Sequence, residues 1–325
     1  MAGLWVVAEP GPDGGLARIS AEAATLVREL ATSAGKDAIG IVVAPDPGPA
    51  AAELATYLPV VWAVTEPAAA ENAWSAVAAG HVAALVGADE PDAVFVGAGA
   101  DGRDLAGAVS AMTGLGVLVN ATAVTWTDQG PAVEMNVFGG KLITTSGFTA
   151  GRGIVTVRPN VTTAAPASSA GRVEPRTTAV TRTLPAVRVV DRVSEANAAA
   201  PIEEARIIVS GGRGVGSTEG FALVREIAEV LGGAVGASRA AVDSGWIPYS
   251  QQIGQTGKIV KPELYLALGI SGAIQHKVGM QTAEAIVAIN RDPDAPIADF
   301  ADVMVVGDLF EVGRAMLDEL RARSG

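Results

Sequence analysis

Short apolar runs separated by longer amphipathic segments dominate the first third of the chain. The runs are rich in Val and Ile and lack polar alternation, which is typical of strands buried on both faces of a parallel sheet. They are Leu4–Ala8, Ile39–Ala44, Val60–Val64 and Ala93–Gly97. Apolar residues at helical spacing predict helices over Ala21–Ser33 and, in an Ala-rich stretch, over Ala69–Val86. Strands that alternate with helices predict an α/β domain.

The pattern changes near Val117, after which strand-like runs follow one another without intervening helices. These runs are Ala121–Thr127, Val133–Phe138, Lys141–Thr145 and Ile154–Val157. Turn residues at Asp128–Pro131 and a two-residue connection within Phe138–Lys141 predict hairpins. The first domain is therefore expected to carry antiparallel strands added to a mostly parallel sheet.

Residues 160–204 are rich in Thr, Ala, Pro and Arg. They contain one apolar strand candidate, Ala186–Val190, and then a polar, Ala-rich stretch that reaches Pro201. A linker is expected at Asn197–Glu204. A chain of 325 residues is long enough for two domains, which we place at residues 1–196 and 205–325, with the linker at 197–204.

The alternation of strands and helices resumes after the linker. The predicted strands are Arg206–Val209, Gly233–Gly236, Leu264–Leu268, Ala285–Ile289 and Val303–Val306. The predicted helices are Ser217–Leu231, Gly272–Met280 and Leu309–Arg323. Both domains are therefore assigned to the α/β class, each with a mostly parallel sheet flanked by helices.

Composition narrows the chemistry that the chain can perform. It has no cysteine, which excludes disulfides, thiolate catalysis and cysteine-ligated metal or iron–sulfur centres. It has only two histidines, so we expect no metal site. The net charge is -12 and no Lys/Arg run occurs, which argues against nucleic acid as a partner.

Two features of the sequence bear on its location. No run reaches the ~18 apolar residues of a membrane span, so we expect no direct membrane insertion. The N-terminal residues Met1–Val7 lack a basic segment and are typical of a first strand rather than of a signal peptide. A cytoplasmic location is the expectation.

A glycine-rich run, Ser210–Ser217, follows the first strand of the second domain and precedes a predicted helix. Glycines there allow backbone N–H groups to approach an anion, and Arg213 can add a charge-assisted contact to a pyrophosphate. The spacing departs from the dinucleotide fingerprint, because Ser217 stands where a third glycine is required. The next strand ends in Ser238 and Arg239 rather than in an acidic ribose reader. A nucleotide site is favoured over an ordinary turn, but an NAD-type site is not.

Polar segments follow other strand ends, where ligands bind in open α/β sheets. Arg239 could stack on a planar ring or hold a charged oxygen, or it could pair with Asp243 on the surface. Thr256 lies in the polar loop Gly254–Lys258. Its hydroxyl both donates and accepts, which suits a heteroatom whose protonation changes on reduction, although a plain turn is the alternative.

The segment after the Leu264–Leu268 strand carries Ser271, a good N-cap that would leave first-turn N–H groups open to an anion. His276 falls about one turn inside this helix, where a structural role and a role beside the anion are both open. Asn290 and the pair Asp308-Leu309 also follow strand ends. They could bind a ribose or an adenine, or form caps and turns.

The first domain and the chain as a whole offer little catalytic chemistry. Gly97–Asp104 follows a strand and is interpreted as a helix start rather than as a second nucleotide pocket. His81 lies in the Ala-rich helix and is expected to be structural. No Ser/His/Asp set, carboxylate pair or P-loop occurs, so no catalytic residue is assigned.

Together these motifs closely resemble the alpha subunit of electron transfer flavoprotein. The matching segments are Ser210–Ser217, Val235–Asp243, Gly254–Lys258, Leu268–His276, Ile286–Asn290 and Gly307–Phe310, and they cover nearly all of residues 206–312. The first domain resembles the family more loosely, through Phe138-Gly139-Gly140 and Thr156–Pro159. The resemblance implies a second domain of the DHS-like FAD-binding type.

The resemblance also implies an FAD site and the role of each residue in it. Arg213 contacts the pyrophosphate, Ser238 lies near the phosphates, and Arg239 lies over the isoalloxazine ring. Gln255 and Thr256 line the flavin, with Thr256 near N5. The complete implied set is Arg213, Ser238, Arg239, Ile253, Gly254, Gln255, Thr256, Ser271, Gly272, Ala273, Ile274, Gln275, His276, Asn290, Asp308 and Leu309.

The remaining roles concern the helix after the Leu264–Leu268 strand and the last two strands. Ser271–Gln275 are implied to cradle phosphate and ribityl groups, and His276 to lie near the C2 carbonyl. The adenosine end is implied to be held by residues after the last strands, Asn290, Asp308 and Leu309. Positive groups near N1 and C2 would stabilise the reduced anionic flavin. Lys277 stands where the family usually has an apolar residue and could alter the field at the flavin.

The function implied by the resemblance is that of a heterodimeric electron carrier without a substrate-turnover site. The implied partners are a beta subunit, expected to carry AMP and to pack on the first domain, and flavoprotein dehydrogenases such as the acyl-CoA dehydrogenases of fatty acid beta-oxidation. Electrons would pass on to a membrane electron transfer flavoprotein:quinone oxidoreductase. An NAD-dependent α/β oxidoreductase, a bifurcating variant of the family and a flavin-free binding module are the alternatives.

Overall fold

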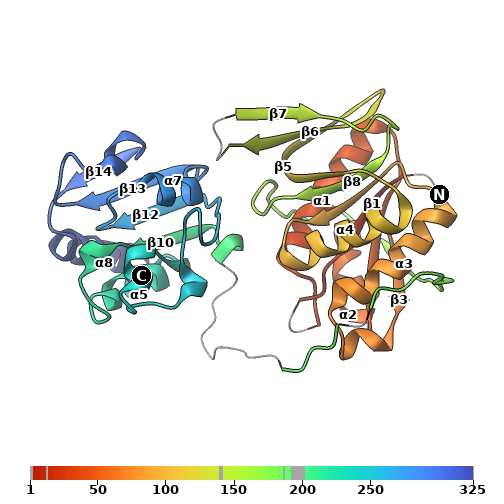
Figure 1. The fold of residues 1–325 in the computed structure, drawn as a ribbon, viewed down its shortest axis with the longest axis horizontal. Coiled ribbons are helices and arrows are strands. Elements are labelled where there is room, and N and C mark those ends of the chain that lie inside the picture. Colours follow the sequence, from red (N-terminus) through yellow and green to blue (C-terminus); the bar gives the residue numbers. More distant parts are fainter. Residues whose placement is uncertain (1–2, 12–13, 139–141, 186, 192–201, 325) are drawn as a thin grey trace. The chain divides into compact units, whose positions relative to one another are not determined.

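The computed structural model divides the chain into two units, Met1–Val193 and Ser194–Gly325 (Figure 1). It describes residues 3–11, 14–138, 142–185, 187–191 and 202–324. The centre of the hairpin predicted within Phe138–Lys141 lies outside the described residues, and so do residues 197–201 of the predicted linker. The exact domain boundaries therefore stay a prediction.

The first unit is built on one mixed sheet, which has nine strands within the described residues, in the order β7-β6-β5-β8-β4-β1-β2-β3-β9. The strands are β1 (Leu4–Ala8), β2 (Ala38–Ala44), β3 (Val60–Thr65), β4 (Ala93–Gly97), β5 (Val117–Thr127), β6 (Gly130–Val137), β7 (Leu142–Ser146), β8 (Gly153–Val157) and β9 (Arg172–Pro175). Strands β5, β6 and β7 pair antiparallel, and the other pairs are parallel. The added antiparallel strands are thus confirmed.

Helices cover both faces of this sheet, because its central strands are apolar on both sides. The helices are α1 (Arg18–Ala34), α2 (Gly48–Leu54), α3 (Trp74–Asp89) and α4 (Ala100–Thr113), with a 3₁₀ turn at Pro67–Ala70. Val27 of α1 and Leu54 of α2 belong to the core on one face. Val82 of α3 and Leu105 of α4 belong to the core on the other.

Two predicted elements of the first unit differ from the structure. The strand predicted over Ala186–Val190 is wrong within the residues described there, because the N–H of Val189 bonds to the Glu71 carbonyl in a loop rather than to a strand. The edge strand is β9, which pairs parallel with β3. The predicted Ala-rich helix begins at Trp74 instead of Ala69, because the Glu66 carboxylate caps the separate 3₁₀ turn.

The second unit is built on a parallel sheet of five strands among the residues described there, in the order β11-β10-β12-β13-β14. The strands are β10 (Ile207–Gly211), β11 (Ala234–Ala237), β12 (Leu264–Leu268), β13 (Ala285–Asn290) and β14 (Val303–Val306). The helices are α5 (Phe221–Val230), α6 (Arg239–Asp243), α7 (Ile274–Met280) and α8 (Leu309–Ser324), with 3₁₀ turns at Ile202–Glu204, Arg213–Val215, Tyr249–Gln251 and Pro296–Asp299.

Each face of the second sheet has its own core. Phe221 of α5 and Leu317 of α8 pack with Val209 and Leu266 on one face. Met280 of α7 packs with the 3₁₀ turn at Pro296–Asp299 on the other. The predicted α/β class, with two mostly parallel sheets flanked by helices, is therefore confirmed. No helix among the described residues is long and apolar enough to cross a membrane.

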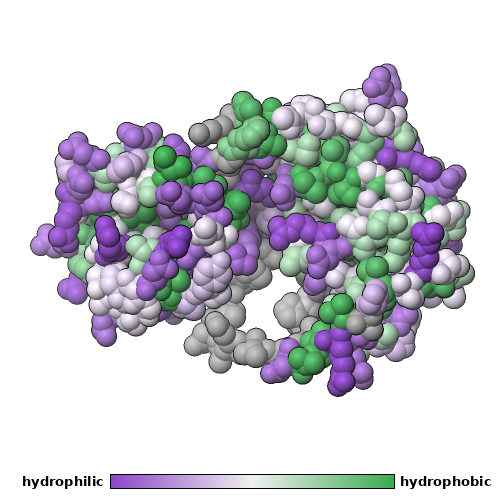
Figure 2. Space-filling view, in the orientation of Figure 1, coloured by the Kyte–Doolittle hydropathy of each residue, from purple (hydrophilic) through white to green (hydrophobic). Residues whose placement is uncertain are grey.

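One end of β6 and β7 presents apolar side chains to the surface. Phe138 is 78% exposed, Ile143 67% and Leu142 54%. Figure 2 shows hydrophobic surface gathered over this end of the two strands. Val137 pairs with Leu142 and Asn136 with Ile143, so Leu142 and Ile143 lie on opposite faces of the ribbon. We call Phe138, Leu142 and Ile143 the apolar ribbon.

Candidate functional site

The predicted site residues gather at the carboxyl edge of the second sheet. The chain runs from β10 outward to β11 and then returns to β12 on the other side of β10, so the strand order reverses there. Ligands of open α/β sheets bind in the crevice at such a switch point. A predicted residue lies at or just after the end of each of the five strands described in this unit, namely Arg213, Ser238, Ser271, Asn290 and Asp308.

The glycine-rich run after β10 packs backbone against backbone on the segment after β12. The N–H of Gly212 donates to the Leu268 carbonyl over 2.8 Å, and that of Gly214 to the Gly269 carbonyl over 3.0 Å. A Cβ on Gly212 would lie 2.2 Å from the Gly269 oxygen, so no side chain fits. Arg213 is exposed beside this junction.

The helix predicted to open at Ser217 begins four residues later, at Phe221. A 3₁₀ turn at Arg213–Val215 and the left-handed Gly216, with φ 83°, come first. The N–H groups of Val215 and Gly216 donate to carbonyls within this turn. The glycine-rich run therefore places the exposed Arg213, and not the start of α5, at this edge of the sheet.

Ser238 and Arg239 occupy the end of β11 and the start of α6. The Ser238 hydroxyl oxygen is buried and has no hydrogen-bond partner among the described residues. Leaving such a group unsatisfied is costly, and a phosphate oxygen would satisfy it. Arg239 Nε lies 3.3 Å from Asp243 Oδ2, with both side chains about two-thirds exposed. The surface pair foreseen as the alternative is thus present, but exposed pairs of this kind are weak and easily exchanged.

The loop formed by residues 253–258 exposes the side chains of Gln255 and Thr256 while its backbone is anchored. We call it the flavin-lining loop after the role that the resemblance implies for it. The Gln255 N–H donates to the Gln275 carbonyl over 2.7 Å. The Tyr249 hydroxyl donates to the Thr256 carbonyl over 2.6 Å. The buried Gln252 amide donates to Thr256 Oγ1 over 3.1 Å, which leaves the Thr256 proton free for an outside acceptor.

His276 lies beneath this loop and is only 6% exposed. Its Nδ1 is 3.0 Å from the Ile253 carbonyl and its Nε2 is 2.9 Å from the Tyr265 hydroxyl. A carbonyl only accepts, so Nδ1 carries the proton and Nε2 accepts from Tyr265. Burial lowers the pKa of His276 to about 4, against the opposing effect of the Ile253 hydrogen bond. The ring is therefore neutral, and its two nitrogens are occupied by this chain.

The predicted N-cap at Ser271 is wrong. The helix α7 begins at Ile274, and its N-cap is Ala273, whose side chain makes no cap. Ser271 is exposed, and its carbonyl accepts from the N–H of Ile297 over 3.0 Å. The left-handed Gly272, with φ 81°, follows, and a Cβ there would lie 2.3 Å from the Ile297 nitrogen. Close packing on the Pro296–Asp299 turn therefore sets where α7 starts.

The residues implied at the adenosine end form caps and turns within the chain. Asn290 donates its amide to the Ile270 carbonyl over 2.9 Å and accepts from the N–H of Asp292 over 3.1 Å. Asp308 Oδ1 accepts from the N–H of Phe310 over 2.8 Å at the start of α8. Leu309 is 5% exposed and packs in the core. The side chains of Asn290 and Asp308 therefore fix the turns at the ends of β13 and β14.

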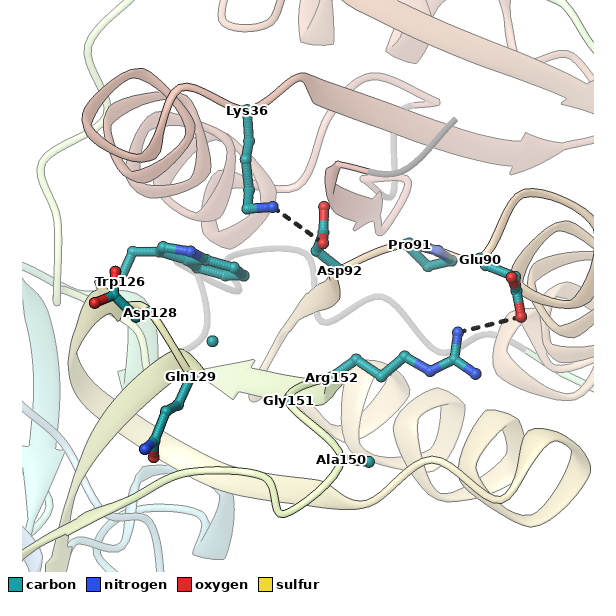
Figure 3. A pocket seen from close by; sticks show the side chains of 11 residues that line it. Lys36, Glu90, Pro91, Asp92, Trp126, Asp128, Gln129, Ala150, Gly151 and Arg152 are labelled. Carbon is teal, nitrogen blue, oxygen red and sulfur yellow. Dashed lines mark hydrogen bonds and ion pairs between the residues drawn. The ribbon is translucent and has the colours of Figure 1, made fainter.

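A separate cavity of about 380 Å³ lies in the first unit (Figure 3). The two basic side chains that line it form ion pairs, Lys36 with Asp92 over 3.0 Å and Arg152 with Glu90 over 3.4 Å. Asp92 and Arg152 immediately precede β4 and β8, so the cavity lies at the amino ends of strands, away from the edge where ligands bind.

The other first-unit candidates have structural explanations. His81 bonds to Thr178 through Nδ1 and to Glu66 through Nε2, as expected for a structural histidine. In the Gly97–Asp104 run, Gly99 is the N-cap of α4. A Cβ on Gly102 would lie 2.0 Å from the Gly97 oxygen, so close packing requires this glycine.

Sequence reasoning missed the residues that hold the flavin-lining loop, namely Tyr249, Gln252 and Tyr265. Tyr265 lies within an apolar strand and is typical of a core residue there. No local pattern signals that its hydroxyl meets an imidazole from another element.

Comparisons with known proteins cover almost the whole chain. A model of the electron transfer flavoprotein domain matches residues 4–183, and a model of the electron transfer flavoprotein FAD-binding domain matches residues 201–281. The chain is 42% identical over 323 residues to an electron transfer flavoprotein subunit alpha of Mycobacterium leprae, covering 96% of each. The corresponding subunit of Mycobacterium tuberculosis is 40% identical over the full length of both chains. That of Thermoanaerobacterium thermosaccharolyticum is 36% identical, covering 98% of this chain and 97% of that one.

Proposed function

Because this chain belongs to the family of electron transfer flavoprotein alpha subunits, we propose that it holds FAD at the carboxyl edge of β10–β14 and passes electrons between other flavoproteins and a quinone reductase. The second unit carries the FAD-binding domain of this family. The observation that carries the proposal is the Ser238 hydroxyl, buried at the switch point without a partner among the described residues.

The chain's own groups fit FAD at this edge. The Ser238 hydroxyl and the exposed Arg213 would hold the phosphates. The N–H groups of Gly212, Gly214 and Val215 are donated within the chain, so this run shapes the turn that carries Arg213. The segment Ser271–Gln275 would lie along the ribityl chain. Asn290, Asp308 and the Leu309 backbone would border the adenosine.

The isoalloxazine ring of bound FAD supplies the electron-transfer chemistry. Thr256, whose hydroxyl is oriented by Gln252, would offer its proton to the ring, and the exposed Gln255 would line the ring beside it. Arg239 supplies positive charge near the ring, once its exposed pair with Asp243 is exchanged. Ile253 and Gly254 form the buried base of the flavin-lining loop.

The family implies a heterodimer with a beta subunit. We propose that residues 1–196 pack on this subunit and that the apolar ribbon is part of the contact. AMP belongs to the beta subunit in this proposal. In this proposal the electron donors are acyl-CoA dehydrogenases and other flavoprotein dehydrogenases of fatty acid beta-oxidation. The acceptor is electron transfer flavoprotein:quinone oxidoreductase. The complex works in the cytoplasm and has no substrate-turnover site of its own.

An NAD-dependent oxidoreductase is less favoured, because β11 ends at Ala237 and is followed by Ser238 where an acidic ribose reader would be required. A bifurcating complex would use the same residues of this chain. The two differ in whether the beta subunit holds a redox-active nucleotide.

The test is to co-express the chain with its beta subunit and to record the absorbance of the purified complex. We expect flavin bands, release of FAD on denaturation, and bleaching when an acyl-CoA dehydrogenase and its substrate are added. A colourless complex that takes up no added FAD would contradict the proposed function.

A further inference from the structure

Tyr265 is a fully buried polar residue in β12, the central strand of the sheet at whose carboxyl edge FAD is proposed to bind. It is 0% exposed and pairs in register with Ile208 on β10 and Ile286 on β13. Its hydroxyl lies 2.9 Å from His276 Nε2. Burial raises the pKa of Tyr265 well above its usual value, so the hydroxyl keeps its proton and donates it.

His276 transmits this contact to the flavin-lining loop. Its Nδ1 proton is donated to the Ile253 carbonyl, and the N–H of Ile253 donates to the Ala237 carbonyl at the end of β11 over 2.9 Å. Ile253 is therefore fixed on both sides. A Cβ on Gly279 of α7 would lie 2.3 Å from the Gly254 nitrogen, so the next residue of the loop is packed directly on that helix.

We propose that Tyr265 is a positioning residue that acts through His276 to hold the flavin-lining loop. This inference rests on the proposed function, because the loop presents Gln255 and Thr256 to the cofactor. A hydroxyl in the rigid central strand sets the tautomer and orientation of the imidazole. The imidazole in turn sets the height of the loop above the sheet.

The arrangement also assigns the charge at the site. A histidine that accepts through Nε2 and donates through Nδ1 carries no positive charge, so His276 does not serve as a cation for the reduced flavin. The positive charge that stabilises the reduced flavin is then supplied by Arg239, which is exposed at the same edge of the sheet. His276 and Arg239 therefore have separate tasks, placement of the loop and electrostatics.

The first test reads the His276 tautomer in the complex. This chain contains only His81 and His276, so a ¹⁵N-histidine-labelled chain combined with unlabelled beta subunit gives two imidazole signals, assigned with His81→Gln. We expect His276 to carry its proton on Nδ1 and not to titrate between about pH 5 and 8. A proton on Nε2, or titration in that range, would overturn the inference.

The second test is a double-mutant cycle on FAD release from the complex. Tyr265→Phe removes the hydroxyl and should raise the FAD dissociation rate about threefold to tenfold. This change corresponds to the free energy that one hydrogen bond contributes. In a His276→Gln background the same substitution should have no further effect, because Tyr265 acts through His276. Tyr57→Phe, the same chemical change in the first unit, should leave the rate unchanged.

The outcomes separate the inference from the proposed function. If Tyr265→Phe raises the FAD dissociation rate as much in the His276→Gln background as in the wild type, the two residues act independently. That result, in a complex that binds FAD, overturns the inference alone. A wild-type complex that binds no FAD overturns the proposed function, and the inference with it. If Tyr265→Phe does not fold, the tautomer measured in the wild-type complex still decides between a Tyr265-held and a free imidazole.

Discussion

Arg239 has two uses for its positive charge. In the structure its guanidinium pairs with Asp243 in the same short helix α6, where both groups are exposed. Under the proposed function, this guanidinium just after β11 would instead stack on the flavin ring. Exposed ion pairs contribute at most about 1 kcal/mol, so the charge is available to a ligand that excludes water.

The Arg239 charge is predicted to set the flavin potential. A cation stabilises the reduced, negatively charged flavin, so Arg239→Ala should make the potential more negative than Arg239→Lys does. Asp243→Asn removes the competing carboxylate and should shift the potential in the positive direction. Arg225→Ala, which removes one exposed charge on α5, is the control for net charge. Equal potentials in the wild type, Arg239→Lys and Arg239→Ala, measured by redox titration, would refute the assignment.

Lys277 shows how a single contact alters an expectation about charge. The sequence indicated that its ammonium could change the field at the flavin. In the structure the ammonium lies 4.5 Å from the centre of the Phe300 ring, in a cation–π contact. A cation–π contact contributes about 0.5–1 kcal/mol at such partly exposed sites. Phe300 therefore restrains the position of the Lys277 ammonium.

At the scale of elements, the sequence predicts best what local pattern alone determines. The continuous apolar runs of β1, β4 and β12 have in the structure the bounds predicted for them, because strands buried on both faces leave an unambiguous signal. The ends of helices were less predictable. The start of α5 depends on the left-handed Gly216, and the start of α7 on packing against the Pro296–Asp299 turn.

The same limit applies to the site. Ser238 and Thr256 could be proposed from their place after strands and in loops, since these positions follow from topology. Tyr265 and Gln252 could not, because their partners are set by how α7 packs on the sheet and by the path of a loop, which local pattern does not determine. The sequence therefore suggests which residues lie at the carboxyl edge of the sheet better than it suggests which residues hold them in place.

The contact between the segments after β10 and β12 is predicted to be intolerant of any side chain. In Gly212→Ala the new Cβ would lie 2.2 Å from the Gly269 oxygen, and the backbone must shift. We expect a loss of about 1–3 kcal/mol in the free energy of unfolding and loss of FAD from the complex. Thermal unfolding and flavin content measure the two effects.

Gly107→Ala is the matched control. Gly107 lies in α4, and a Cβ there meets no atom within 4 Å. Alanine is the better helix former by about 0.5–1 kcal/mol, so this variant should be slightly more stable and keep its FAD. A Gly212→Ala complex as stable and as yellow as the wild type would show that the two segments are not packed as described.

At the scale of the whole molecule, the two units have separate cores but unequal surfaces. The clusters of buried residues stay within one unit or the other. The first unit additionally exposes the apolar ribbon, with apolar residues on opposite faces of two strands at the free edge of its sheet. Exposed apolar side chains on an edge strand mark an interface or an aggregation site. A beta subunit would cover it.

The chain produced alone is therefore predicted to aggregate or to bind FAD weakly, and co-expression with the beta subunit should correct both. The double variant Leu142→Ser with Ile143→Ser, produced alone, should remain in solution longer than the wild-type chain. Its affinity for the beta subunit should fall about tenfold or more, as it does when a buried interface residue is truncated. Val190→Ser is the control, since Val190 is 88% exposed but lies outside the apolar ribbon. Light scattering of the chain alone and titration with the beta subunit measure the two effects. If the double variant binds the beta subunit as tightly as Val190→Ser does, the apolar ribbon is not part of that contact.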